Sequence, residues 1–545
     1  MGASGSRSDK LLALVLVATA LTFAISVTFP FVGWDDPRYA SANPLVLHPL
    51  AQGWRMLLTT PTLGYPQGVT VLSYALNHAV FGMTPWSFHL VNLALHLVNV
   101  ALLARIAAAL GLLPREAAIA AMIFALHPIV AEPVCWVTGR KDLLATSLLF
   151  GAAVVLLRGD RDAPFPSARR WVLAAAMCVV GMGAKPSVAV AAGVLFVVLA
   201  AARPLWSLRR LALVLAPLGA IGALVVAAAG HAQRDAQDMH ARSLADAVLD
   251  VLGACTLQLQ HLVWPVGLVP HYERDPGDPS LAAMIVGACV LLALAFVLVR
   301  SDKRGPIFAG LAVAIVSFAP MSNVLAVNRW TADSYMYLPL AGIAITVATA
   351  TRGLVTDRIA RVAWPALGAA MAFVALGQAS TWRTPESVWQ AVADRYPTSP
   401  IGYTELAKTF AWEGKRDEGT AAFVAVDVKF PEFESALAER ADARLAVGDE
   451  ARAVRLLERG VAADDLPSAR RLWLAIVQRQ IDPRETTRAI LERSFDMDAA
   501  EMRRQIADHR VWTLVAEVLR AVGSDARAKI AEAFASLPDA QAPSP

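Results

Sequence analysis

The chain has 545 residues, of which 56% are hydrophobic and 17% charged, and the hydrophobic residues gather in blocks about as long as a bilayer crossing. The formal net charge is only +4, with basic residues in short loops or alternating with acids, which excludes a nucleic-acid footprint. Cys135, Cys178, Cys255 and Cys289 lie far apart, so neither a CxxC zinc site nor a disulfide framework is indicated.

The apolar blocks predict about eleven membrane crossings of about 20 residues each. They lie near 11–33, 86–104, 117–134, 142–157, 171–184, 187–202, 211–229, 281–299, 306–325, 336–351 and 362–379. The first run is longer than a signal-peptide core and lacks a small-residue cleavage site, so we interpret it as an uncleaved span. The predicted fold class is all-α, with a polytopic membrane domain over 1–380 and a charged, soluble helical domain over 381–545.

Basic residues gather in alternate short loops and predict the orientation. They are Arg7, Lys10, Arg105, Arg115, Arg158, Arg169, Arg170, Arg203, Arg209, Arg210, Arg300, Lys303, Arg304, Arg352, Arg358 and Arg361. The side that carries them is predicted to be cytoplasmic, which places the N-terminus inside and the soluble domain outside. The abundance of Ala, Arg and Val suggests a bacterial chain, and hence the plasma (inner) membrane with a periplasmic tail.

The same orientation places the long segments 34–85 and 230–280 outside. Both are too polar to span and too long to be turns, so we expect helices that lie along the membrane surface. Segment 243–263 fits this expectation, because Val248 and Leu252 lie opposite Asp246 and Asp250 at helical spacing.

The tail contains an internal repeat. Gly414 and Gly448 are separated by 34 residues, which is the period of tetratricopeptide repeats. Large, small and helix-ending residues recur in that register at Tyr403, Leu406, Ala407, Phe410, Phe423, Pro431, Leu437, Ala441, Ala453 and Leu457. Segments 382–397 and 468–522 are helical in pattern and would complete a stack, since single repeats cannot bury their apolar faces. The sequence therefore predicts a TPR-like α-solenoid.

Four polar clusters follow outward-facing span ends, where ionisable side chains are costly and indicate a site. The first contains Asp35 and Asp36, whose mutual repulsion would raise one pKa and leave a base or a cation site. Asp-Asp-Pro is also a common turn sequence. The second cluster contains His127, Glu132, Arg140, Lys141 and Asp142. Arg140 and its neighbour Lys141 could merely anchor span ends, but that role does not explain His127 and Glu132.

The third cluster is Lys185-Pro186, a cation suited to a phosphate or, equally, a helix-breaking turn. The fourth contains Arg329, Asp333, Tyr335 and Tyr337. Its aromatic residues could form an interfacial belt, whereas Arg is the usual bidentate partner of a phosphate. Because all four clusters face one side of the membrane, we expect them to share one polar cavity.

Several motifs together resemble one family. They are Trp34-Asp35-Asp36 with Asn43-Pro44, Pro85 with Phe88-His89-Leu90-Val91-Asn92-Leu93 and Leu95-His96-Leu97-Val98-Asn99, Phe124-Ala125-Leu126-His127-Pro128 with Glu132, Trp136 and Gly139-Arg140-Lys141-Asp142, Trp264-Pro265, and Asp333-Ser334-Tyr335-Met336-Tyr337-Leu338-Pro339. With the repeat tail, this set resembles bacterial relatives of the transmembrane and tetratricopeptide-repeat O-mannosyltransferases, members of the GT-C glycosyltransferase superfamily. The chain departs from the family pattern at Pro186, where Glu is common, and at Ser334, where Arg is common.

The resemblance implies a membrane enzyme that uses a polyprenyl-phosphate sugar, usually mannose, with Asp35 and Asp36 at the catalytic centre. A carboxylate there can take the proton of an acceptor hydroxyl, and Lys185, Arg140 and Arg329 are candidates to stabilise the departing phosphate. We expect inversion, no cofactor and no obligatory metal, although a carboxylate pair could hold a divalent cation.

Further substrate contacts are expected from the other members of the clusters, namely His127, Glu132, Asp142, Asp333, Tyr335 and Tyr337. The tail would bind an acceptor protein, since stacked helix pairs offer a concave surface. The alternative is a non-enzymatic membrane anchor that displays repeats for an envelope complex. A transporter is disfavoured because the ionisable residues gather at one surface and not at the mid-plane.

Overall fold

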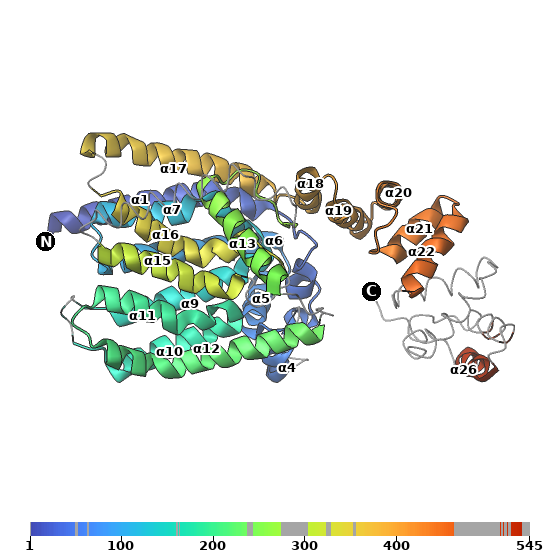
Figure 1. Cartoon of the computed structure of the whole chain (residues 1–545), viewed down its shortest axis with the longest axis horizontal. Coiled ribbons are helices and arrows are strands. Elements are labelled where there is room, and N and C mark those ends of the chain that lie inside the picture. The colour runs from blue at the N-terminus through green and yellow to red at the C-terminus, as the bar shows by residue number, and fades with distance from the viewer. Residues whose placement is uncertain are drawn as a thin grey trace. The chain divides into compact units, whose positions relative to one another are not determined.

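The computed structural model describes residues 2–49, 53–62, 65–159, 162, 164–236, 244–273, 304–322, 329–352, 356–462, 513, 516, 520 and 525–536. The chain divides into two compact units, Met1–Arg395 and Tyr396–Pro545 (Figure 1). Helices dominate the described parts of both units, as the sequence predicts.

The longer helices of the first unit are α1 (Gly2–Phe23), α5 (Gly68–Phe81), α6 (Pro85–Ala109), α7 (Pro114–Leu126), α9 (Arg140–Leu157), α10 (Ala168–Ala184), α11 (Ala191–Ala202), α12 (Leu208–Ala236), α13 (Leu244–Val263), α15 (Arg304–Phe318), α16 (Tyr337–Ala350), α17 (Asp357–Ser380) and α18 (Pro385–Arg395). Short helical segments are η1 (Ala24–Thr28), η2 (Pro37–Ser41), α2 (Pro44–Leu47), α4 (Trp54–Thr59), η3 (Pro128–Val130), α8 (Ala131–Cys135), η4 (Val137–Gly139), η5 (Pro186–Val190), η6 (Ala319–Met321) and η7 (Asp333–Met336). Two short strands, β1 (Pro61–Thr62) and β2 (Tyr65–Pro66), pair antiparallel with Pro61 opposite Pro66.

Four helices among the described residues are long and apolar enough to cross a membrane. They are Asp9–Thr28, Pro85–Ala109, Leu208–Gly230 and Arg358–Ser380. The pair Pro114–Leu126 and Pro128–Cys135, bent by 53°, would form a fifth crossing if it is a single span. These helices are compatible with a multi-pass membrane protein.

Helices also occupy most of the other expected spans. Residues 142–157, 171–184, 187–202, 306–325 and 336–351 correspond to α9, α10, α11, α15 and α16. The span expected at 281–299 lies outside the described residues. The count of about eleven crossings therefore stays a prediction.

Helix α6 carries a buried polar stripe that connects it to its neighbours. The Asn92 amide donates to the Trp136 carbonyl at 2.9 Å. Nδ1 of His96 lies 2.8 Å from the Tyr337 hydroxyl, and the Asn99 amide donates to that hydroxyl at 3.1 Å. Because polar groups within an apolar bundle need partners, this stripe fixes how α6 packs on α8 and α16.

Small residues let α15 and α16 approach closely. A Cβ added to Gly342 would lie 2.3 Å from the Gly310 carbonyl oxygen, and one added to Gly310 would lie 2.3 Å from the Thr346 hydroxyl. Only glycine fits at such a contact, and small residues at helix crossings are typical of membrane bundles.

A hydrophobic cluster anchors the segment that follows α1. Tyr39 and Val46 from this segment pack with Tyr74 of α5, Phe88 of α6 and Val137 of η4, all at most 1% exposed. The first part of the expected surface segment 34–85 therefore packs on α5, which belongs to the same segment, and on α6, and it lies against η4.

The described helices of the second unit are α19 (Pro400–Trp412), α20 (Arg416–Lys429), α21 (Leu437–Ala446), α22 (Glu450–Ala462) and α26 (Asp525–Ala535). Gly414 lies between α19 and α20 with φ 77°, and Gly448 lies between α21 and α22 with φ 80°. Glycine is favoured at such left-handed helix ends, so the 34-residue spacing corresponds to two helix pairs with the same kind of turn. Most of segment 468–522 lies outside the described residues, and a complete TPR-like solenoid stays a prediction.

One buried carboxylate joins the two helix pairs of the second unit. Asp427 on α20 accepts from Arg440 at 2.8 Å, from Arg444 at 2.6 Å and from Arg452 at 3.0 Å. Burial alone would raise the pKa of Asp427, but the hydrogen bonds from the three arginines outweigh it and lower the pKa. The ionised form is therefore stabilised in the folded tail, and its contribution is lost as the pH falls through this lowered pKa.

Replacing Asp427 by Asn is expected to destabilise the helices α20–α22 by about 3–5 kcal/mol, because it leaves the buried Arg440 without a counter-ion. Hydrogen exchange in the full chain should show faster exchange of amides in residues 416–462. The matched replacement Glu432→Gln removes an exposed carboxylate and should leave exchange unchanged. Equal exchange in the two variants would show that the arginine cluster does not hold the tail together.

Candidate active site

Asp36 is a structural link between two distant segments. Its buried carboxylate accepts the Val32 N–H at Oδ2 (2.9 Å), and the Thr138 N–H (3.2 Å) and hydroxyl (2.6 Å) at Oδ1. Burial raises the pKa of Asp36 to about 6, and the charge of Asp35 adds to that effect while the hydrogen bonds oppose it. Asp36 thus fastens the loop after α1 to η4.

Asp35 is differently placed, because it is partly exposed. The preceding Trp34 stacks on Trp136 with ring centroids 4.9 Å apart. The guanidinium carbon of Arg329 lies 4.9 Å from the Trp34 ring centroid. The backbone at Asp35 is therefore held on both sides, by the Trp34 stack and by Asp36, while its own side chain remains accessible.

Lys141 connects the acidic loop to the other cations. Its ammonium lies over two aromatic rings, 4.8 Å and 5.0 Å from their centroids. Burial lowers the pKa of Lys141, the charges of Asp35 and Asp142 raise it, and those of Lys185 and Arg329 lower it further. Lys141 is linked to Arg329 through the Trp136–Trp34 stack, because the two cations lie 5.0 Å and 4.9 Å from those rings. We call Lys141 and the four charged side chains that act on it the charged cluster.

Arg140 lies apart from this cluster. Its guanidinium donates to the side-chain oxygens of Asn92 (3.0 Å) and Asn77 (2.9 Å) and to the Phe88 carbonyl (2.9 Å). The structure thus places Arg140 in the packing of α5 and α6 and not among the phosphate-binding candidates. Successive residues of a helix point about 100° apart, so Lys141 faces the site where Arg140 does not. That rule was the available signal for Lys141, which belongs to the second polar cluster of the sequence but is not among the predicted substrate contacts.

His127 and Tyr337 are also committed to packing. Nδ1 of His127 accepts the Ile129 N–H at 3.3 Å, and its Nε2 lies 3.1 Å from the Leu262 carbonyl oxygen. The Tyr337 hydroxyl is bound by His96 of α6. Both side chains are almost fully buried. The hydrogen bonds of both side chains therefore hold neighbouring segments together, and neither residue belongs to the charged cluster.

Glu132 organises the segment that carries Arg329. Its carboxylate accepts from the Arg329 guanidinium (2.8 Å), the Ser334 hydroxyl (2.8 Å) and the Asp333 N–H (3.1 Å). Arg329 pairs with Glu132, which is 197 residues away in sequence, although Asp333 lies in its own predicted cluster. Glu132 therefore positions Arg329 and leaves Asp333 to other partners.

Asp333 is buried and contacts Tyr272 and His261. The Tyr272 hydroxyl donates to its carboxylate at 2.8 Å, and Nδ1 of His261 lies 3.8 Å away. Burial and the neighbouring charge of Glu132 raise the pKa of Asp333 well above its usual value. Asp333 therefore pairs with Tyr272 and His261, and it is not among the charges that act on Lys141.

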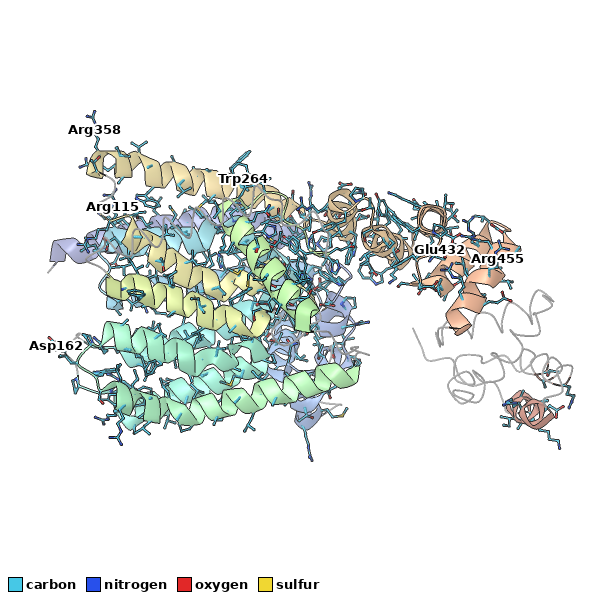
Figure 2. All side chains as sticks on the ribbon, in the orientation of Figure 1. Arg115, Asp162, Trp264, Arg358, Glu432 and Arg455 are labelled. Atoms are coloured by element: carbon cyan, nitrogen blue, oxygen red, sulfur yellow. The ribbon has the colours of Figure 1, made fainter. Side chains whose placement is uncertain are left out.

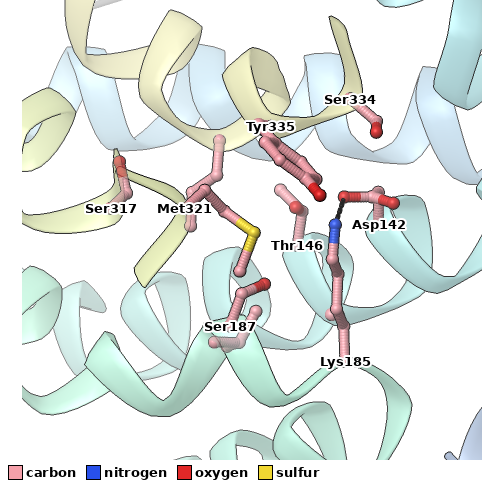
Figure 3. Close-up of a pocket in the computed structure, with 11 residues that line it drawn as sticks. Asp142, Thr146, Lys185, Ser187, Ser317, Met321, Ser334 and Tyr335 are labelled. Atoms are coloured by element: carbon pink, nitrogen blue, oxygen red, sulfur yellow. Dashed lines mark hydrogen bonds and ion pairs between the residues drawn. The ribbon is translucent and has the colours of Figure 1, made fainter. Parts of the chain in front are cut away.

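A small pocket of about 20 Å³, with room for about one water molecule, contains Asp142 and Lys185 of the charged cluster in its lining (Figure 3). It is lined by Asp142, Ala145, Thr146, Lys185, Ser187, Val188, Ser317, Met321, Ser334, Tyr335 and Leu338. Lys185 donates to Oδ1 of Asp142, and its ammonium lies 5.5 Å from the Tyr335 ring centroid. Figure 3 shows the Lys185 and Asp142 side chains facing each other at one side of the pocket. An ammonium among hydroxyl groups suits an oxyanion, which would have to replace the Asp142 carboxylate as the partner of Lys185.

Both carboxylate oxygens of Asp36 accept hydrogen bonds from the protein, whereas Asp35 is partly exposed. Among the residues that the structure describes, no three His, Cys, Asp or Glu side chains gather as metal ligands.

Gly139 is required by the turn that carries Glu132 and Thr138. A Cβ at this position would lie 2.4 Å from the Pro133 carbonyl oxygen and 2.6 Å from the Pro133 Cα. Since these are backbone atoms, Gly139→Ala must displace the turn, and we expect a loss of about 1–3 kcal/mol in the free energy of unfolding. Thermal unfolding in detergent measures it.

The matched control is Gly377→Ala in α17, where an added Cβ meets nothing within 4 Å. That variant should be neutral or up to about 1 kcal/mol more stable, because alanine favours the helix. Equal melting temperatures for the two variants would contradict the close approach of Gly139 to Pro133.

Comparison with known proteins gives partial matches, and no family model matches the chain. It is 39% identical to protein O-mannosyl-transferase TMTC2 of Mus musculus over 100 residues, 18% of this chain and 12% of the relative. It is 35% identical to protein O-mannosyl-transferase Tmtc1 of Drosophila melanogaster over 152 residues, 26% and 18% of the two chains. The matched part is less than a fifth of each of these relatives. Over that part, the chain is similar to proteins that are named protein O-mannosyl-transferases.

Proposed function

We propose that the chain is a membrane glycosyltransferase that moves a sugar, in the first place mannose, from a polyprenyl-phosphate donor to a hydroxyl group of an acceptor protein. The observation that carries the proposal is the charged cluster, in which the partly exposed Asp35 follows Trp34 directly. Arg329 lies 4.9 Å from the Trp34 ring, and Lys141 lies 5.0 Å from the Trp136 ring that stacks on Trp34. Such a transfer needs a base and a group of cations close together. The partial similarity to proteins named O-mannosyl-transferases supports the sugar.

In this mechanism Asp35 takes the proton from the acceptor hydroxyl. The hydroxyl oxygen attacks the anomeric carbon, the bond from that carbon to the lipid phosphate oxygen breaks, and the electron pair leaves with the phosphate. One such displacement inverts the anomeric centre. Asp36 does not react, because its carboxylate is occupied by Val32 and Thr138, and it acts as a positioning residue for Asp35.

The departing phosphate is stabilised by Lys141, Lys185 and Arg329. Lys185 is paired with Asp142 in the structure, so an incoming phosphate competes with that carboxylate for the ammonium. Arg329 is preorganised by Glu132, which keeps its guanidinium in place before the donor binds. These three cations supply the charge without an obligatory metal.

The membrane arrangement that we propose is of the GT-C type, with about eleven crossings in a bacterial plasma membrane. The N-terminus is cytoplasmic, whereas the charged cluster and residues 381–545 are extracytoplasmic. Figure 2 supports this orientation, since Arg115 and Arg358 lie at one end of the helix bundle and Trp264 lies nearer the other. Basic residues mark the cytoplasmic end of such bundles.

The tail is proposed to bind the acceptor protein. Its paired helices α19–α22 share the turn geometry of Gly414 and Gly448, which supports a stack of TPR-like repeats. Such stacks present a concave surface to extended chains.

The test uses the full chain, purified and reconstituted in liposomes with polyprenyl-phosphate mannose labelled in the sugar. We expect hexose on Ser or Thr of an extracellular acceptor domain, detected by mass spectrometry, together with release of polyprenyl phosphate. Slow release of labelled mannose to water measures the same bond breaking when no acceptor is present. If the protein neither transfers nor releases sugar from any polyprenyl-phosphate donor, the proposal is overturned. Capture of envelope proteins by the tail would then favour a non-enzymatic membrane-anchored scaffold.

A further inference from the structure

Helix α13 has the opposite polarity to a helix on the surface of a water-soluble protein. Its inward face carries Asp250, Gln258 and His261, which are 6%, 2% and 1% exposed. Its outward face carries Leu249 and Leu252, which are 66% and 59% exposed. A helix that meets water places its apolar side chains inward and its polar side chains outward. The outward face of α13 is therefore suited to an apolar medium.

The apolar surface continues beyond the end of α13. Trp264 and Val266 follow the helix and are 66% and 56% exposed. Two residues later the Leu268 carbonyl accepts from the Gln378 amide of α17 at 2.9 Å. Helix α17 is one of the four long apolar helices, and its Phe373 is 80% exposed. The end of α13 that carries Trp264 (Figure 2) therefore lies near α17, a helix with the length and composition to face lipid.

The inward face of α13 is bonded to the segment that begins at Arg329. The Gln258 amide donates to the Thr331 hydroxyl at 2.6 Å and to the next carbonyl at 3.0 Å. The indole N–H of Trp330 donates to the Asp250 carbonyl at 3.2 Å. Movement of α13 would therefore move the segment that presents Arg329 to the charged cluster.

We propose that the outward face of α13, with Trp264 and Val266, lies against the lipid of the bilayer, and that this contact holds the Arg329 segment in place. We call this surface the lipid-facing brace. Its polar face meets protein, whereas an ordinary amphipathic surface helix turns its polar face to water. The lipid contact stands on its own, and its effect on transfer rests on the proposed function.

The lipid contact is tested by replacing Leu252 with the photo-crosslinking residue p-benzoylphenylalanine in the full chain, reconstituted in phosphatidylcholine vesicles. After irradiation, mass spectrometry identifies what is joined to position 252. The positive control carries the crosslinker at Phe373 of α17. The negative control carries it at Val428, which is 68% exposed on the soluble tail.

We expect phosphatidylcholine adducts at positions 252 and 373 and none at 428. Lipid adducts at 373 alone would overturn the brace, as would crosslinks from 252 to a second copy of the chain. Absence of lipid adducts at both positions would overturn it too, because then lipid does not cover this side of the bundle.

The coupling to the site is tested with Leu252→Asn, which places an amide against lipid, and with the apolar swap Leu252→Phe. Hydrogen exchange in vesicles should be faster for the amides of residues 330–335 in Leu252→Asn, and unchanged in Leu252→Phe and in the tail variant Val428→Asn. Unchanged exchange in Leu252→Asn would overturn the coupling. Neither measurement requires transfer activity, so the brace and the proposed function can fail separately.

Discussion

Replacing Asp35 by Asn is expected to lower the rate of sugar transfer by a factor of about 10²–10⁴ without loss of folded protein. Asn has nearly the same shape but cannot take a proton. Because Asp35 is partly exposed, its replacement should leave the melting temperature nearly unchanged. Initial rates with labelled donor in liposomes, set beside thermal unfolding in detergent, measure both effects.

The matched variant is Asp36→Asn, which should have the converse pattern. The new amide would point a donor at the Val32 N–H, which loses its acceptor. The free energy of unfolding is therefore expected to change, while the transfer rate of the folded fraction falls about tenfold or less. If Asp36→Asn abolishes transfer and Asp35→Asn retains it, Asp36 is the base and Asp35 is not. That result would contradict the mechanism.

The pH dependence of the free energy of unfolding is expected to differ between the Asp35 and Asp36 variants. The pKa of Asp36 is raised to about 6 in the folded chain, whereas the unfolded carboxyl has an ordinary pKa of 3.8. The folded state therefore binds the proton more tightly, and ionisation of Asp36 costs stability as the pH rises from about 4 to 6, by about 3 kcal/mol in all. Asp36→Asn should lack this loss, and Asp35→Asn should retain it.

Removal of the Glu132 side chain is expected to cost about 3–5 kcal/mol, because Glu132→Ala leaves the Arg329 guanidinium in a largely buried place without its carboxylate. The Ser334 hydroxyl and the Asp333 N–H lose the same acceptor. Transfer should fall as well, since the segment that presents Arg329 is no longer fixed. Thermal unfolding and donor KM measure the two consequences.

The control for Glu132→Ala is Glu405→Ala on the tail, which removes a pair with Lys408 whose side chains are 29% and 40% exposed. Surface pairs of this kind contribute about 0–1 kcal/mol. The double variant Glu132→Gln/Arg329→Gln should recover part of the stability, because no buried charge is left unpaired. A double variant less stable than both single variants would contradict this account of the pair.

The helical architecture was predictable because apolar runs of span length and the glycine-punctuated tail are local patterns. The 34-residue spacing of Gly414 and Gly448 anticipated two equivalent turns, and both have positive φ. The close approach of Gly310 to Gly342 was not predictable, since glycine in an apolar helix has no local signal for the helix that it meets.

The site was predictable in its clusters but not in the roles within them. Asp35 and Asp36 have the same chemistry, and Thr138, 102 residues away, is what separates them. The partner of Arg329 is likewise distant, because Glu132 replaces the nearby Asp333. Local spacing brings residues to a site, whereas hydrogen bonds between distant segments decide which of them remain available to a ligand.

The chain twice places an anchoring residue directly beside an accessible one. Asp36 and Arg140 are buried and fully bonded, whereas their neighbours Asp35 and Lys141 face the charged cluster. Fold maintenance and ligand contact are therefore divided between adjacent codons. Substitution of the accessible member of each pair can therefore remove the chemistry of the site while the anchoring member preserves the scaffold, so that activity is lost at small cost in stability.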